Sequence, residues 1–442
     1  MRRAIYLSLR AASALDHWLR ERLTRAGWLA LGAGGAAAAA GIDLNQTVTA
    51  QAFTFLAALL LLAFGASFIF RARLEARREL PRYATAGERF AYRVTVLNRG
   101  ASPLVGAALA ERFRDPRPAY AEWRAAREPG EERRNWWDRT VGYFRWRWLI
   151  ERRVPETEDA VEVPDLSPGA SLTLKLAFTP RRRGRIELAG LRVSRTEPLG
   201  LVRGLARVPL EARVIALPRR YRLPALVLPG KRKFQPGGVS LASSVGDSEE
   251  FLSLRDYRPG DPLHRVHWKS FARTGKPIVK EFQDEFYERH ALVLDTGSAA
   301  GEDAAFEEAV ALAASFVYTI DTQECLLDLL LVGGEVRTYT AGRGQLHAEH
   351  MLEVLAAVGP SAPGDFEALA RAALSRRSSL SSIIVVLLGW DEPRRRFVAA
   401  ARGLGIDVRA LFVCPAREAP ADAAGLVVLH PGEIERGLAG LR

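Results

Sequence analysis

Residues 246–282 read GDSEEFLSLRDYRPGDPLHRVHWKSFARTGKPIVKEF and combine mixed charge with aromatic side chains at a density that is unusual for a linker. A flexible linker is rich in glycine and serine or carries charges of one sign. Here acidic and basic residues alternate around the turn Pro259-Gly260-Asp261, where they can pair with one another. We therefore expect a rigid connector over residues 240–285, which leads into an apolar strand at 291–294 that ends before Asp295.

The connector resembles the signature of the bacterial "domain of unknown function 58" family. The matching residues run without a gap from Glu250 to Arg273, with His267 where the family often has aspartate. The residues to which the resemblance assigns a signature or interaction role are Glu250, Phe251, Arg255, Tyr257, Gly260, Asp261, Arg265, Trp268 and Arg273. We expect most of them to fix the connector to the domain that follows.

The resemblance also implies a function. Members of the family are often encoded beside MoxR-type AAA+ ATPases, and the family context implies a von Willebrand factor A-like domain. It therefore implies a non-enzymatic, membrane-anchored adaptor that presents a cytoplasmic A-type domain to such an ATPase. The expected role is in the assembly or maturation of envelope or secreted complexes.

Composition and missing motifs narrow the classes of protein to consider. With 48% hydrophobic and 26% charged residues the chain is expected to fold, and 442 residues predict two to three domains. Its two cysteines, Cys325 and Cys414, cannot form a disulfide framework. No G-x-x-x-x-G-K-[ST] or G-x-G-x-x-G occurs, so nucleotide binding has no support. A net charge of +12 favours anionic partners. Because apolar spans are also present, we expect the anionic partner to be the lipid bilayer, and we expect no binding of nucleic acid.

The N-terminal region predicts a membrane anchor. Residues Val48–Phe70 are uncharged and would span ~35 Å as a helix, enough for the ~30 Å hydrocarbon core of a bilayer. A weaker apolar stretch at 28–42 would complete a transmembrane helical hairpin over residues 26–70. Arginines flank both spans and none lies between them, so we expect a multi-pass protein of the bacterial inner membrane with its C-terminal bulk in the cytoplasm. Residues 1–25 would be cytoplasmic or interfacial, and the alternative for this region is a cleaved signal peptide.

Residues 80–218 show the period of two that is typical of strands. Short strands separated by turns predict a β-sandwich here. An insertion at 112–155 holds five of the nine tryptophans among many arginines, a composition typical of membrane or partner contact. The contact residues that we assign are Trp123, Trp136, Trp137, Trp146 and Trp148. The alternatives are a long β-hairpin whose tryptophans pack on the sandwich, and stacking on single-stranded nucleic acid.

Residues 286–442 alternate apolar strands with helical patterns, which predicts a doubly wound α/β domain. The family resemblance makes this domain von Willebrand factor A-like. The predicted fold is therefore multidomain, with a helical hairpin, a β-sandwich and an α/β domain in chain order. Functional residues of such sheets lie at the carboxyl ends of the strands, where Asp295 and Asp391 are placed.

Asp295 supports more than one chemical interpretation. A-like domains often bind Mg²⁺ through D-x-S-x-S, but Gly297 and Ala299 occupy the hydroxyl positions here. Mg²⁺ would therefore sit in a degenerate site of Asp295 and Asp391, as part of a metal-dependent adhesion or binding module. Alternatively, Asp295-Thr296-Gly297-Ser298 resembles the active-site strand of an aspartic-protease-like hydrolase, although we find no second D-T-G and a long helix is predicted to follow. Otherwise, Asp295 caps the next helix or pairs with the basic connector.

Overall fold

The structure is a computed structural model that describes most of the chain as two compact units, one made mainly of residues 1–220 and the other mainly of residues 221–442. Each unit is described by itself. The described residues are 2–40, 47–224, 249–261, 263, 266–284, 288–297, 303–320, 325–333, 335–341, 345–361, 363–414 and 425–439.

Three helices open the first unit, namely α1 (Arg2–Arg22), α2 (Arg25–Ala40) and α3 (Thr47–Ser67). Among the described residues, one stretch of helix, Val48–Ser67 with a mean hydropathy of 2.0, is long and apolar enough to cross a membrane. The 16 residues of α2 cover only ~24 Å at ~1.5 Å per residue, less than the ~30 Å hydrocarbon core. α2 packs along α3. The structure therefore supports one candidate span and does not support two.

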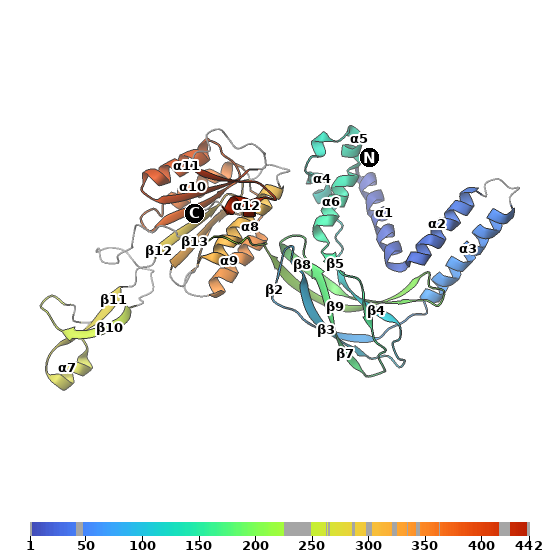
Figure 1. The fold of residues 1–442 in the computed structure, drawn as a ribbon, viewed down its shortest axis with the longest axis horizontal. Coiled ribbons are helices and arrows are strands. Elements are labelled where there is room, and N and C mark those ends of the chain that lie inside the picture. The colour runs from blue at the N-terminus through green and yellow to red at the C-terminus, as the bar shows by residue number, and fades with distance from the viewer. Residues whose placement is uncertain are drawn as a thin grey trace. The chain divides into compact units, whose positions relative to one another are not determined.

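Two sheets follow (Figure 1). The four-stranded sheet has the order β1 (Leu74–Glu79), β3 (Phe90–Asn98), β7 (Ser171–Thr179) and β5 (Glu156–Thr157). The five-stranded sheet has the order β2 (Tyr83–Thr85), β9 (Arg203–Leu217), β8 (Gly184–Thr196), β4 (Ala107–Phe113) and β6 (Val161–Val163). Val94 and Val96 of β3 and Leu109 of β4 are fully buried in one shared apolar core. The alternation predicted for β3 is confirmed.

The insertion is helical and does not form a β-hairpin. It contains α4 (Tyr120–Ala125), η1 (Glu131–Arg133), α5 (Trp136–Val141) and α6 (Tyr143–Arg153). Trp123 and Trp146, each 2% exposed, pack with Tyr6 of α1 in one cluster. Their side chains are buried, so the surface-contact role assigned to these two tryptophans is corrected to packing within the unit. Trp148 is partly buried beneath the guanidinium of Arg152, 4.1 Å from its ring centroid.

A turn between β8 and β9 is organised by the buried carboxylate of Glu197. This carboxylate accepts hydrogen bonds from the backbone N–H groups of Leu201 at 2.7 Å and Val202 at 3.1 Å. A buried carboxylate with several N–H donors stabilises a turn because the donors would otherwise be unsatisfied.

The same turn holds the joint between α1 and α2. The Thr24 hydroxyl donates to the carbonyl oxygen of Gly200 at 2.6 Å, and the Thr24 N–H donates to that of Leu201 at 3.0 Å. A Cβ atom at Gly27 would lie 2.1 Å from the Leu201 oxygen, so only glycine permits this approach. The helices therefore join the sheets at a fixed point.

Replacing Glu197 with alanine should loosen this joint. Two buried N–H groups would lose their acceptor, and each unsatisfied group costs about 1–3 kcal/mol. We expect a melting temperature several degrees below that of the wild type, measured by circular dichroism in detergent. The matched control is Glu211→Ala in the neighbouring exposed part of β9, which should melt like the wild type. Equal melting of both variants would contradict the role given to Glu197.

The second unit contains a six-stranded sheet. Its order is β14 (Val336–Ala341), β13 (Cys325–Val332), β12 (Glu288–Leu294), β15 (Ser382–Leu387), β16 (Asp407–Val413) and β17 (Leu426–Leu429). All neighbours pair in parallel except β13 with β14. The chain order reverses between β12 and β15, which makes their carboxyl ends the switch point of the sheet.

Helices cover both faces of this sheet. α10 (Phe366–Leu374) and α11 (Glu392–Gly403) share a buried cluster with alternate residues of β12, β13, β15 and β16. Figure 1 draws α8 (Asp303–Thr319) and α12 (Ile434–Leu438) on the other side of the sheet. The remaining helices are α9 (Gln345–Ala357) and η3 (Pro363–Asp365). The strands and helices predicted for this region are present, as a parallel sheet with crossover helices requires.

The signature segment forms a small element of its own. β10 (Glu249–Asp256) and β11 (Ile278–Asp284) make an antiparallel two-stranded sheet. α7 (Trp268–Thr274) lies between them in the chain, and Val266 pairs with Val279 of β11. The connector is therefore a β-hairpin whose loop carries a helix.

Candidate functional site

The switch point of the six-stranded sheet gathers the polar residues that the sequence singled out there. β12 is buried on both faces, and Asp295 is the first residue after it. Its N–H donates to the carbonyl oxygen of Val386 in β15 at 2.9 Å, so the sheet pairing continues one residue beyond the strand. The side chain is thereby directed across the carboxyl end of β15.

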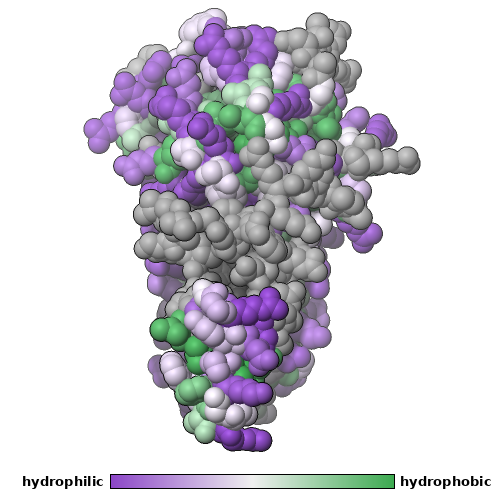
Figure 2. Space-filling model, turned by 90° about the vertical axis from the view of Figure 1, so that its left-hand side faces the viewer, coloured by the Kyte–Doolittle hydropathy of each residue, from purple (hydrophilic) through white to green (hydrophobic). Residues whose placement is uncertain are grey.

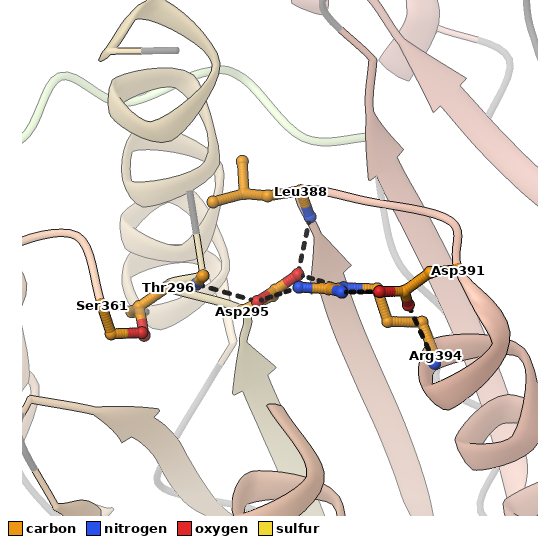
Figure 3. A network of polar contacts seen from close by, with 7 residues as sticks. Asp295, Thr296, Ser361, Leu388, Asp391 and Arg394 are labelled. Atoms are coloured by element: carbon orange, nitrogen blue, oxygen red, sulfur yellow. Dashed lines mark hydrogen bonds and ion pairs between the residues drawn. The ribbon is translucent and has the colours of Figure 1, made fainter. Parts of the chain in front are cut away.

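Arg394 of α11 binds this carboxylate with two hydrogen bonds (Figure 3). Arg394 Nε donates to Asp295 Oδ2 at 2.7 Å, and Nη2 donates to Oδ1 at 3.0 Å. The two carboxylate oxygens also accept the N–H groups of Gly297 and Leu388, each at 3.0 Å. The ion pair is buried, with the Arg394 side chain 4% exposed and the Asp295 side chain 1% exposed. The Asp295 carboxylate therefore accepts four hydrogen bonds, all from groups within the protein.

Asp391 completes the arrangement on the other side of the guanidinium. Its Oδ2 accepts Arg394 Nη1 at 2.6 Å, and its Oδ1 accepts the Arg394 backbone N–H at 3.3 Å, which makes Asp391 the N-cap of α11. In contrast to Asp295, the Asp391 side chain is 52% exposed. One arginine thus joins a buried and an exposed carboxylate.

The surroundings of Arg394 fit a guanidinium. Its Cζ lies 4.8 Å from the ring centroid of Phe366, a favourable cation–π distance. A Cβ at Gly389 would lie 3.4 Å from Cζ, so a glycine leaves this space to the arginine. Burial alone would lower the pKa of Arg394, but hydrogen bonds and charge from Asp295 and Asp391 outweigh it and raise that pKa. The arginine stays charged at all physiological pH values.

This geometry does not fit the magnesium site expected from Asp295 and Asp391. The guanidinium lies where a cation shared by the two carboxylates would have to lie. The hydroxyl of Thr296, the nearest candidate ligand in sequence, instead donates to the carbonyl oxygen of Val332 and contacts the Ser361 hydroxyl. Within the described part of the chain, no group of three acidic, histidine or cysteine side chains could hold a metal ion.

An aspartic-protease-like role for Asp295 has the same difficulty. Such chemistry needs two carboxylates that share a proton beside an activated water. Here an arginine separates the two carboxylates and holds Asp295 by both oxygens. Moreover, α8 and a parallel sheet follow Asp295. The arrangement is one of charge neutralisation, and nothing in it activates a nucleophile.

Removing the Arg394 side chain should strongly destabilise the second unit. Asp295 would remain as a buried carboxylate without its counter-charge, which typically costs about 3–5 kcal/mol. We expect Arg394→Ala to lower the melting temperature by roughly 10 °C, and Asp295→Asn combined with Arg394→Met to recover much of the loss. The matched control is Arg396→Ala, because Arg396 is 78% exposed on the same helix. If the two single variants melt alike, the ion pair is not a structural requirement.

Magnesium provides a second test of the same site. Millimolar MgCl₂ should leave the melting temperature of the wild type unchanged relative to NaCl of equal ionic strength. In Arg394→Ala it should raise the melting temperature, because two carboxylates would then be open to a hard cation. A rise in the wild type that Asp295→Ala abolishes would contradict the assignment.

The signature segment is the second candidate site. Arg255 of β10 binds Asp261 with two hydrogen bonds, from Nη1 at 2.7 Å and from Nη2 at 2.9 Å. Asp261 also accepts the Arg258 N–H at 2.8 Å. The hydrogen bond from Arg255 is the main cause that lowers the pKa of Asp261 to about 2. Gly260 has a φ of 108°, a conformation that glycine adopts without strain. These contacts fix the turn that precedes α7.

Large apolar side chains remain exposed on this element. They are Leu254 (43% exposed), Leu263 (66%), Trp268 (61%) and Phe271 (38%). The Trp268 and Phe271 rings contact edge to face at 5.9 Å. Figure 2 shows hydrophobic side chains at the surface on the side of the molecule where Figure 1 draws α7. Contiguous exposed apolar surface marks interaction sites, and the contact between Trp268 and Phe271 sets this pair apart from singly exposed apolar side chains.

The other signature residues are more dispersed. The Tyr257 N–H donates to the Pro277 carbonyl oxygen at 3.0 Å, and Arg273 is exposed on α7. Glu250 and Phe251 are described by their backbone in β10, and Arg265 lies outside the described residues. The expected attachment of the connector to the α/β domain therefore stays a prediction.

The sequence reasoning missed Arg394 and the apolar residues Leu254, Leu263 and Phe271. A signal existed for Arg394, since it lies three positions after Asp391 and residues at that spacing on a helix can form an ion pair. For the apolar residues, the alternation of large hydrophobic and basic side chains in a short segment was the available sign.

Comparison with known proteins supports the family resemblance. Residues 253–438 match the model of the family described as "Protein of unknown function DUF58". Uncharacterized protein YeaD of Bacillus subtilis is 28% identical over 221 residues, which is 50% of this chain and 54% of the relative. Uncharacterized protein Rv1480 of Mycobacterium tuberculosis is 32% identical over 189 residues, which is 39% of this chain and 58% of the relative. The matched region thus covers little more than half of each of these relatives.

Proposed function

We propose that this protein is a non-enzymatic adaptor, anchored in a membrane, that binds a partner protein through its signature segment. The observation that carries the proposal is the exposed group of Leu254, Leu263, Trp268 and Phe271 on a hairpin braced by the Arg255–Asp261 ion pair. A rigid element that presents aromatic anchors loses little conformational entropy on binding. This segment is therefore the surface we assign to the partner.

The charge around these apolar residues indicates the chemistry of the partner. Lys269, Arg273 and Lys276 are exposed in and next to α7. An apolar helix face flanked by positive charge fits an apolar groove with an acidic rim. Together with the family resemblance, this supports a MoxR-type AAA+ ATPase as the partner, acting on envelope or secreted complexes.

The anchor follows from α3. Its apolar length supports membrane insertion, and exposed arginines flank it on the side of the sheets, at Arg71 and Arg73. With Arg25 ahead of α2, this distribution favours a cytoplasmic location for both sheet-containing units. The multi-pass topology in the bacterial inner membrane is part of the proposal, and it requires the bilayer to thin around α2, whose 16 residues are shorter than the hydrocarbon core.

The finer fold assignments belong to the same proposal. The shared core of the four- and five-stranded sheets supports a β-sandwich. The doubly wound order of the second sheet supports a von Willebrand factor A-like domain. In that domain Arg394 would take the place of the usual metal ion as a fixed positive charge. The role of such a domain is binding, which agrees with an adaptor.

Binding to the ATPase should depend on the aromatic residues of α7. Loss of a central aromatic anchor typically costs at least about 2 kcal/mol, so Trp268→Ala with Phe271→Ala should weaken the affinity at least about thirtyfold. The measurement is biolayer interferometry of the purified full chain in nanodiscs against the MoxR-type ATPase of the same genome. Tyr318→Ala is the matched control, because Tyr318 is a 65% exposed aromatic residue in the same unit. Unchanged affinity of the double variant, or no binding by the wild type, would contradict the proposal.

A further inference from the structure

A second exposed apolar surface lies on α1, outside the signature segment. Leu7 and Leu15 are each 57% exposed and Trp18 is 39% exposed. Together with the exposed Ala11 they follow one another at intervals of four, four and three residues, which places them on one face of the helix. We call this face the α1 stripe.

The opposite face of α1 is already covered. Tyr6 is 6% exposed, its ring lies 5.5 Å from that of Trp146, and its hydroxyl donates to the Pro118 carbonyl oxygen at 3.1 Å. The insertion thus holds one face of α1 and leaves the stripe uncovered. The helix has two apolar faces, and the fold accounts for only one of them.

The stripe ends at the candidate membrane span. The ring of Trp18 stacks on that of Phe64 in α3 at a centroid distance of 5.4 Å. Arg22 lies 5.0 Å from the ring of Phe68 and donates to the Ser67 hydroxyl at 3.2 Å. Arginine and aromatic side chains at the end of an apolar span are typical of the membrane–water interface. The stripe is therefore continuous with the surface that a bilayer would cover.

Positive charge lies beside the stripe. Arg3 and Arg10 are exposed and lie three or four residues from Leu7, so they border it along the helix. Arg10 Nη1 also donates to the Tyr6 hydroxyl at 3.0 Å, which fixes its position. An apolar stripe bordered by arginine is the pattern of a helix that lies in the headgroup region of an anionic bilayer.

From these contacts we propose that α1 lies along the membrane surface, with the α1 stripe in the interfacial layer and Arg3 and Arg10 on anionic lipid headgroups. The insertion packs on the other face of α1, through Trp123 and Trp146 against Tyr6, and thereby fixes the orientation of the helix. This inference rests on the part of the proposed function that places α3 in a bilayer. It does not depend on the partner bound by α7.

The test uses the full chain in nanodiscs of phosphatidylcholine, with or without phosphatidylglycerol. A fluorophore is attached to a cysteine introduced by Ala11→Cys in the stripe or by Asp16→Cys at an exposed position outside the stripe. Both native cysteines are buried, so brief labelling favours the introduced thiol. We expect iodide to quench the label at position 11 several-fold less than the label at position 16. Phosphatidylglycerol should increase this protection, because each arginine near anionic lipid strengthens the binding of the helix to the bilayer roughly fivefold. Replacing both arginines, by Arg3→Gln and Arg10→Gln, should remove the increase.

A third label, introduced by Leu62→Cys in the exposed part of α3, separates the possible failures. Equal quenching at positions 11 and 16, with position 62 protected, would overturn the proposal for α1 and leave the anchor intact. Strong quenching at position 62 would overturn the anchor and this proposal together. Protection at position 11 that does not respond to phosphatidylglycerol would overturn the assigned role of the two arginines.

Discussion

The second unit depends on the buried contact between Arg394 and Asp295. A doubly wound sheet leaves a crevice where its strand order reverses, and here a carboxylate with 1% exposure occupies that position. A buried carboxylate requires a compensating positive charge. The first turn of α11 supplies it, with Asp391 as the helix cap that orients the arginine. The same contact closes the crevice and fixes α11 against the carboxyl ends of β12 and β15.

A positive charge supplied by the chain behaves differently from a bound metal ion. A guanidinium cannot dissociate from the protein and does not lose its proton at physiological pH. The positive charge that Arg394 supplies at the switch point therefore does not depend on the supply of divalent cations. The coordination of a bound ion can rearrange when a ligand arrives. Both members of the Asp295–Arg394 pair are side chains of this chain, so the fold fixes their geometry. Such a site suits a domain that presents a constant surface.

Much of the second unit was predictable because its strands are buried on both faces. After Ser382, β15 appears in the sequence as a continuous apolar run, and in β13 only Asp328 interrupts such a run, as expected for strands between two layers of helices. The same pattern placed Asp295 at the end of a strand. Its partner could not be predicted with equal certainty, because Arg394 is 99 residues away in the chain. Three consecutive arginines occur there, and only the three-dimensional packing selects the first of them.

The insertion shows the opposite case. Its composition of tryptophan and arginine predicted contact, but composition does not distinguish a buried ring from an exposed one. Trp146 and Leu149 are three residues apart and both face the α1 cluster, a spacing that a helical reading of 143–153 would have used. Trp136 and Trp137 are adjacent and remain 66% and 60% exposed. Periodicity within the segment therefore carried the information that its composition lacked.

The two exposed apolar surfaces share one feature, namely positive charge beside them, in a chain with a net charge of +12. Both α1 and α7 place large apolar side chains beside arginine or lysine, whereas the carboxylates of Glu197 and Asp295 are buried, the first hydrogen-bonded to backbone N–H groups and the second paired with Arg394. An anionic bilayer and an acidic protein surface are both attracted by such a pattern. Because the Glu197 turn holds the joint of α1 and α2 through hydrogen bonds, an orientation of α1 on a bilayer, as proposed above, would be passed on to the sheets of the first unit. The membrane would then determine the orientation of the first unit relative to the bilayer, because the joint holds α1 and the sheets in one arrangement.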